Sequence, residues 1–181
     1  MRAPVTELTI TTTWDGAPLA PTEQVRVRLH LSQGALHIRV DAPLHGDPPP
    51  LAPPGPTDRL WEHEVVELFV AAASPAGPPT YTEIELGPAG HHLVLQLRGV
   101  RQVVAARLPL RFRSRRRGAR WLGAAAVERD LLPPPPWRIN AFAIHGEGDG
   151  RRYLAAFPLP GPRPDFHQPA RFPAVSLAAA R

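Results

Sequence analysis

The ten residues 61–70 read Trp61-Glu62-His63-Glu64-Val65-Val66-Glu67-Leu68-Phe69-Val70 and alternate in the manner of a β-strand. Successive side chains of an extended chain point to opposite faces. The odd-numbered residues therefore share one face, with Trp61 and Glu67 about 20 Å apart along it. The even-numbered face becomes apolar from Val66 onward. We expect that apolar face to join a core and the other to form the floor of a shallow groove.

The rest of the chain repeats the pattern in short segments. Residues 25–31 and 36–41 alternate between apolar and polar, and a turn-like triplet between them predicts a hairpin. Further strands are predicted at residues 7–14, 81–86, 92–98, 102–113, 120–127, 139–144, 153–157 and 175–177, with one short helix at 128–132. Many short strands separated by turns are typical of an antiparallel β-sandwich or jelly roll. We expect one all-β domain over residues 1–181.

Proline marks the loops. The chain has 25 Pro among its 181 residues, and many of them fall in residues 43–58. Proline cannot donate to a sheet ladder, so we expect a long surface loop there. Its position just before Trp61 is of interest because long loops often shape binding sites.

Composition excludes several classes of protein. The chain has no Cys, which excludes disulfides, thiolate metal sites and cysteine nucleophiles. No apolar run is long enough to span a bilayer, and residues 1–7 do not resemble a secretory signal. We expect a cytoplasmic protein with no membrane partner.

The net charge of +5 invites a nucleic-acid interpretation, which two observations oppose. All 21 basic residues are Arg, which suggests the codon bias of a GC-rich genome. The arginines are also dispersed, except at residues 111–120. That run is predicted to be a hairpin with a solvated charged turn, so nucleic acid is not an expected partner.

Histidines and carboxylates offer limited metal chemistry. His63 shares a face with Glu67, whereas Glu62 and Glu64 point the other way, so these four cannot converge on one ion. A site built from His145, His167 and a glutamate is chemically reasonable, but no metal-binding spacing is present. We expect no cofactor. A calcium ion held by carbonyl and carboxylate oxygens stays open.

Catalytic signatures are also missing from the sequence. It contains no nucleophile elbow, phosphate loop or nucleotide-binding fingerprint. Glu67 and Glu85 could form the carboxylate pair that glycosidases need, although glutamates on exposed strand faces are common.

The aromatic residues point to a ligand. Trp61 shares its face with His63 and Glu67, and Phe166 lies in a polar, Pro-rich segment that does not look like core. Ring carbons can stack on the apolar face of a sugar while carboxylates and amides take its hydroxyls. This pattern favours a groove for a saccharide or a similar polar ring compound.

The sequence resembles carbohydrate-binding module family nine and the related DOMON-like sandwiches. The resemblance rests on residues 61–69, on Glu83-Ile84-Glu85-Leu86-Gly87-Pro88-Ala89-Gly90, on the strand 139–145 with its Asn140, and on residues 166–172. It implies that Trp61 and Phe166 hold a sugar between them and that Glu67 contacts it. Glu85 takes the place of a basic residue. Haem-binding members use Met and His, and Met1 is the single Met here, so haem is not expected.

A second resemblance covers most of the chain. Leu60-Trp61-Glu62, Glu83-Ile84-Glu85-Leu86, residues 140–146 and Pro164-Asp165-Phe166-His167 are similar to a family of uncharacterised proteins shared by bacteria and vertebrates. This likeness implies companions for Trp61. The complete set of expected ligand-binding residues is Trp61, Glu67, Glu85, Arg98, Asn140, His145, Arg152, Asp165, Phe166 and His167.

The sequence therefore predicts a non-catalytic β-sandwich that binds a saccharide or another small molecule. One alternative is an enzyme, such as a metal-assisted hydrolase, that uses His145, Asp165, His167 and Glu67. Another is a protein-interaction module that uses the Pro-rich loops or the Arg-rich hairpin. The ligand, the pathway and the oligomeric state stay open.

Overall fold

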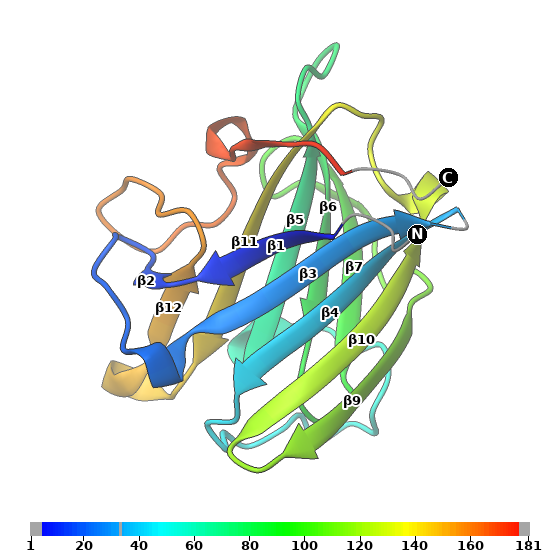
Figure 1. Ribbon diagram of the computed structural model, residues 1–181. Coiled ribbons are helices and arrows are strands. Elements are labelled where there is room, and N and C mark those ends of the chain that lie inside the picture. The colour runs from blue at the N-terminus through cyan, green and yellow to red at the C-terminus, as the bar shows by residue number, and fades with distance from the viewer. Residues whose placement is uncertain (1–4, 33, 178–181) are drawn as a thin grey trace.

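Two antiparallel sheets form the protein in a computed structural model that describes residues 5–32 and 34–177. Sheet A has the strand order β1 (Thr6–Ile10), β3 (Val25–Ser32), β4 (Ala35–Pro43), β10 (Arg120–Glu128), β9 (Arg111–Arg117). Sheet B has the order β2 (Thr12–Thr13), β12 (Arg152–Ala155), β11 (Trp137–His145), β5 (Val65–Ala72), β6 (Thr80–Leu86), β7 (His92–Arg98), β8 (Val103–Ala105), and β13 (Ala174–Val175) pairs with β11. Figure 1 shows sheet A lying over sheet B. The expected antiparallel β-sandwich is confirmed.

Short 3₁₀ helices join the strands. They are η1 (Pro21–Glu23), η2 (Leu60–Glu62), η3 (Arg129–Leu131), η4 (Gly148–Gly150) and η5 (Pro169–Arg171). The predicted helix at 128–132 is the single turn η3. Among the described residues, none of the helices has the length and apolar character needed to cross a membrane.

The main core lies between the sheets and is built from one face of each strand. On β5 the even-numbered residues Val66, Leu68 and Val70 belong to it, together with Trp121 of β10. The alternation predicted for residues 65–70 is therefore confirmed. Burial of this apolar area, at roughly 25 cal/mol per Å², is what holds the two sheets together.

A second apolar cluster covers the outer face of sheet B. It contains Phe69 of β5 and Phe142 of β11, together with Phe166 and Phe172 from residues 158–172. We call residues 158–172 the closing segment. Because sheet B is buried on both faces, its strands read as nearly continuous buried runs. A pocket lies beside this cluster.

Three predicted strands differ from the structure. The strand expected over residues 7–14 is divided into β1 in sheet A and β2 in sheet B. The strand expected from residue 61 begins at Val65, because Leu60–Glu62 form η2. The strand expected over residues 102–113 is broken into β8 and β9. Pro109 and the left-handed Arg107, with a φ of 55°, lie in the break, and neither fits a continuous ladder.

The other predicted segments are found close to their expected places. Arg117 pairs with Arg120 across a turn, so the Arg-rich hairpin at 111–120 is confirmed as β9–β10. Residues 44–59 contain no regular strand, as expected for the Pro-rich loop. This loop carries the chain from sheet A to sheet B.

Candidate functional site

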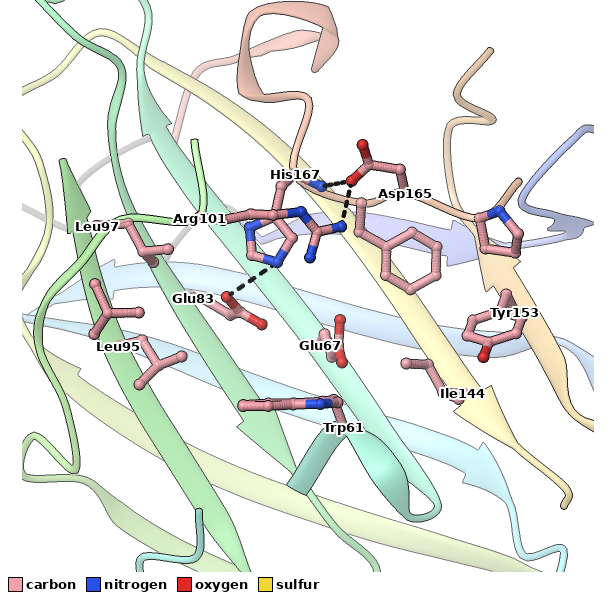
Figure 2. Close-up of a pocket in the computed structure, with 13 residues that line it drawn as sticks. Trp61, Glu67, Glu83, Leu95, Leu97, Arg101, Ile144, Tyr153, Asp165 and His167 are labelled. Atoms are coloured by element: carbon pink, nitrogen blue, oxygen red, sulfur yellow. Dashed lines mark hydrogen bonds and ion pairs between the residues drawn. The ribbon is translucent and has the colours of Figure 1, made fainter. Parts of the chain in front are cut away.

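A pocket of about 350 Å³ opens on the outer face of sheet B. Side chains from β5, β6, β7, β8, β11 and β12 line it, together with η2 and the closing segment. Figure 2 shows the Trp61 ring along one side, opposite His167 and Arg101. The carboxyl groups of Glu67 and Glu83 lie between these two sides. The pocket thus has an aromatic wall, a polar wall and an acidic floor.

Trp61 is a large apolar side chain held at the surface, with 40% of it exposed. Its neighbour Leu60 is fully buried in the second apolar cluster and fixes the short helix η2 to the sheet. The Arg151 guanidinium donates hydrogen bonds to the backbone carbonyls of Trp61, Glu62 and Gly146. The indole is therefore positioned through its backbone and its ring stays available.

The acidic floor comes from neighbouring strands in register. Glu67 of β5 lies directly opposite Glu85 of β6, and Glu83 is two residues along β6 on the same face. All three side chains are buried, with exposures of 2%, 0% and 3% for Glu67, Glu85 and Glu83. Phe142 flanks Glu67 on the other neighbouring strand, and Leu95 flanks Glu83. Buried carboxyls in such apolar surroundings resist ionisation.

The pKa values follow from this burial. Burial raises the pKa of Glu83 to about 8, and the Arg101 charge opposes the rise. Burial also raises the pKa of Glu67, assisted by repulsion from Glu83 and opposed by Arg151. Glu85 has a raised pKa from burial and from both other glutamates, and the Trp61 backbone N–H opposes it without the geometry of a full hydrogen bond. With a pKa of about 8, Glu83 favours its protonated form at neutral pH.

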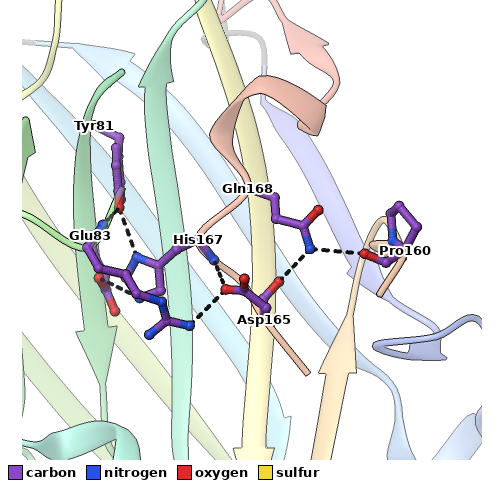
Figure 3. Close-up of polar contacts among 7 residues, drawn as sticks. Tyr81, Glu83, Pro160, Asp165, His167 and Gln168 are labelled. Atoms are coloured by element: carbon purple, nitrogen blue, oxygen red, sulfur yellow. Dashed lines mark hydrogen bonds and ion pairs between the residues drawn. The ribbon is translucent and has the colours of Figure 1, made fainter. Parts of the chain in front are cut away.

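A hydrogen-bonded chain builds the polar wall (Figure 3). The Tyr81 hydroxyl accepts the backbone N–H of Arg101 at 2.9 Å and contacts Nδ1 of His167 at 2.9 Å. A phenol has one proton to donate, and we assign its hydrogen bond to Nδ1 of His167 as acceptor. The neutral imidazole then carries its own proton on Nε2. Nε2 lies 3.9 Å from Oε2 of Glu83. Burial lowers the pKa of His167 to about 4, with Arg101 adding to the effect and Asp165 opposing it.

Asp165 joins the remaining members of this wall. Its Oδ1 accepts the His167 backbone N–H at 3.0 Å and the Arg101 guanidinium at 2.8 Å. Arg101 adopts a left-handed backbone with a φ of 60°, an uncommon conformation for a residue with a side chain. Gln168 donates to the carbonyls of Asp165 and Pro160 and so fastens the closing segment to itself.

The structure brings five of the expected ligand-binding residues into this pocket. They are Trp61, Glu67, Asp165, Phe166 and His167. Glu85 lies on the same sheet face but beneath the lining, and Arg98 is exposed at the end of β7 without lining the pocket. Whether the five bind a ligand stays a prediction.

Phe166 corrects the expectation that its segment lies outside the core. It is only 7% exposed and stacks on Phe142 with ring centroids 4.0 Å apart. The Pro-rich closing segment folds back onto sheet B, and its aromatic residues bury the sheet's outer apolar face. Phe166 therefore supports the pocket from within the second cluster rather than standing free like Trp61.

Three other expected companions do not lie in the pocket. Asn140 is fully buried, and its side chain bonds the backbone N–H and carbonyl of Phe157. His145 points into the sandwich, where it stacks on His45 at 3.5 Å, because it alternates with the pocket-facing Ile144. Arg152 forms an ion pair with Glu23 at 3.0 Å. The cluster of His145 with Asp165 and His167 proposed for an enzyme is therefore not assembled.

Sequence reasoning missed the polar and aromatic side chains of Glu83, Arg101 and Tyr153, together with Tyr81 behind them. Tyr81 lies behind the wall and the other three line the pocket. Glu83 could have been found, since it shares a strand face with Glu85. Arg101 had no local signal, because a left-handed turn brings it to the site. Within residues 5–32 and 34–177, no group of three His, Asp or Glu side chains has the arrangement of a metal site.

Solved structures with this fold include proteins that bind carbohydrate. A candidate carbohydrate-binding protein from Bacteroides uniformis superposes with a TM-score of 0.68 at 21% identity, covering 98% of this chain and 87% of that one. A family-nine carbohydrate-binding module from Caldicellulosiruptor kristjanssonii, in complex with cellotriose, has a TM-score of 0.62 at 10% identity, with coverages of 98% and 84%. At these identities the likeness establishes the fold alone.

Relatives in sequence are found in vertebrates, although no family model matches the chain. The UPF0462 protein C4orf33 homolog of Mus musculus is 43% identical over 164 residues, which are 86% of this chain and 83% of the relative. UPF0462 protein C4orf33 of Homo sapiens is 42% identical, with coverages of 86% and 80%. The Danio rerio homolog is 37% identical, with coverages of 86% and 81%. The chain belongs to the UPF0462 family.

Proposed function

We propose that this protein is a non-catalytic binding module for a small saccharide or a similar polar ring compound. The observation that carries the proposal is the exposed Trp61 ring facing a wall and floor of hydrogen-bonding groups. An aromatic ring offers a flat apolar surface to the C–H face of a sugar, and the surrounding polar groups fix its orientation. Binding modules of the same fold that are in complex with cellotriose and with glucose support this choice.

The pocket suits a ligand of one or two rings. Its volume of about 350 Å³ is near the lower end of ligand pockets, which run from roughly 300 to 1,000 Å³. Hydroxyl groups would find acceptors in the carboxyls of Glu67 and Glu83 and a donor in the Arg101 guanidinium. An anionic ligand would meet the acidic floor, so we expect neutral or cationic compounds.

The first test removes the aromatic wall. In Trp61→Ala, affinity for a saccharide found by glycan array should fall about tenfold or more, because ring stacking is lost. Isothermal titration calorimetry measures the change. Phe157→Ala is a matched control, since Phe157 is also 40% exposed and does not line the pocket. Equal affinities of wild type and Trp61→Ala would rule out the assignment.

A second candidate function, general-acid catalysis on the same ligand, is favoured by one observation. A carboxyl group with a pKa of about 8, as at Glu83, holds a proton at neutral pH, which a general acid must do. Turnover of a chromogenic glycoside that disappears in Glu83→Gln would establish this function. Saccharide binding with no turnover would leave the binding function alone.

A further inference from the structure

The floor of the pocket has more carboxyl groups than its surroundings can satisfy. Both carboxyl oxygens of Glu85 and Oε2 of Glu83 are buried without a hydrogen-bond partner among the described residues. Glu67 faces Glu85 directly across the β5–β6 ladder. Buried polar atoms are normally paired, and like charges opposite one another on a sheet destabilise it. The arrangement thus leaves acceptors unused at the base of an open pocket.

The nearby cations are already engaged. The Arg101 guanidinium is bound to Asp165, and about 60% of its side chain is exposed. Arg151 donates to three backbone carbonyls around Trp61. His167 accepts from Tyr81 and is neutral in the assignment given above. Glu67 and Glu83 line the pocket and Glu85 lies beneath them. Among the described residues, none of the three forms an ion pair with an arginine.

We propose that the pocket selects a ligand bearing a protonated amine, with the ammonium group on the Glu67 and Glu83 carboxylates and the ring against Trp61. An amino sugar fits this description, and for that ligand the inference rests on the saccharide-binding function proposed above. An ammonium group supplies three donors, which match the unpartnered Oε2 of Glu83 and the carboxyl oxygens of Glu67 in the pocket lining. Its charge-assisted hydrogen bonds are stronger than those of a hydroxyl, and an aromatic face adds cation–π attraction.

The amine also explains how the floor can ionise. In the free protein, burial raises the pKa of Glu83 to about 8 and also raises the pKa of Glu67, whereas a nearby positive charge favours the carboxylate form. Binding of an ammonium ion at neutral pH therefore displaces a proton from the floor into solvent. A neutral sugar displaces none, because it brings no charge. Other ionisable groups that face the floor are Arg101, Arg151, Asp165, His167 and Tyr81.

Calorimetry with matched ligands tests the proposal. Glucosamine should bind wild-type protein at least about tenfold more tightly than glucose, and N-acetylglucosamine should show no advantage over glucose. Titrations in two buffers with different ionisation enthalpies should show release of about one proton for glucosamine and none for glucose. In Glu83→Gln the preference should shrink to a few-fold or less while glucose still binds. Glu62→Gln, an exposed glutamate paired with Arg59, should behave as wild type.

Each failure has a distinct signature. Equal affinities for glucosamine and glucose, without proton release, would overturn the amine inference and leave saccharide binding intact. Binding of cyclohexylamine without binding of any sugar would overturn saccharide binding and keep the amine site. No binding by any of the four compounds would overturn both. A preference that survives unchanged in Glu83→Gln would also overturn the site as proposed.

Discussion

Glu83 shows how one residue can link stability to the state of the pocket. Its carboxyl group lies between Phe69 on β5 and Leu95 on β7, and one of its oxygens has no hydrogen-bond partner. Folding therefore moves this group from water into apolar surroundings, which favour its neutral form. The raised pKa of Glu83 is thus a direct consequence of its place in the fold.

This burial predicts a loss of stability at alkaline pH. Burial raises the folded-state pKa of Glu83 to about 8, from 4.5 for an unperturbed glutamate. The folded protein therefore holds this proton more tightly than the unfolded chain, and the stability that this contributes is lost as pH rises toward 8. The pKa values of His145 and His167 are lowered to about 4. These two residues therefore change the free energy of unfolding mainly below pH 6.5. Between pH 6.5 and 8 the free energy of unfolding should fall by about 1.5 kcal/mol through Glu83.

Urea unfolding at the two pH values measures this slope. Glu83→Gln cannot ionise and should lose much of the decrease, whereas Glu62→Gln should keep it. Parallel pH profiles for wild type and Glu83→Gln would show that Glu83 is ionised in the free protein.

At the same scale, sequence alone predicted part of the site. Alternation placed Glu67 on the face that became the pocket floor. It placed Trp61 correctly for the wrong reason, since η2 rather than a strand carries the indole. The polar wall was partly predicted through Asp165 and His167. Their partner Arg101 was not predicted, because Arg101 and Asp165 are 64 residues apart in sequence.

Strand β11 shows that an alternating sequence predicts a strand but not which of its residues contact a ligand. Its register with β5 and β12 is regular, and both faces are buried, so alternation alone cannot say which core each residue enters. Asn140, implied as a ligand contact by family resemblance, instead continues the ladder. Its side chain pairs with Phe157 at 2.9 and 3.2 Å where the backbone leaves β12.

Removal of that amide should therefore affect stability. Asn140→Ala leaves the N–H and carbonyl of Phe157 without partners, and the free energy of unfolding should fall by about 2–3 kcal/mol. Urea unfolding measures the loss of stability. A ligand titration carried to saturation should show a nearly normal affinity. Normal stability combined with lost binding would make Asn140 a ligand contact after all.

The chain passes between the two sheets several times, and the crossing from β4 to β5 is a long one. Residues 44–59 leave β4 in sheet A and reach β5 in sheet B. The buried Glu64 carboxylate accepts the backbone N–H groups of His45 and Gly46, both at 3.0 Å, and of Asp47 at 3.4 Å. A Pro-rich sequence predicts a loop, but its anchor could not be predicted because it depends on folded backbone geometry.

Glu64→Ala should release this crossing. Hydrogen bonds to a charged acceptor contribute about 1.5–3 kcal/mol each, so we expect a loss of roughly 2–4 kcal/mol in the free energy of unfolding. Hydrogen exchange at the amides of residues 45–47 should accelerate selectively. Glu62→Ala is the control because its carboxyl is exposed. Unchanged protection at these amides would contradict the anchoring role.

The exposure of Trp61 has an optical consequence. Of the other three tryptophans, Trp121 and Trp137 are 1% and 4% exposed and Trp14 is partly buried against the second apolar cluster. Dissolved quenchers such as acrylamide should therefore reach Trp61 most readily. A compound seated on its indole would shield it and shift its emission. The protein therefore contains a native fluorescent reporter at the mouth of its own pocket, and compound libraries can be screened against the unlabelled chain.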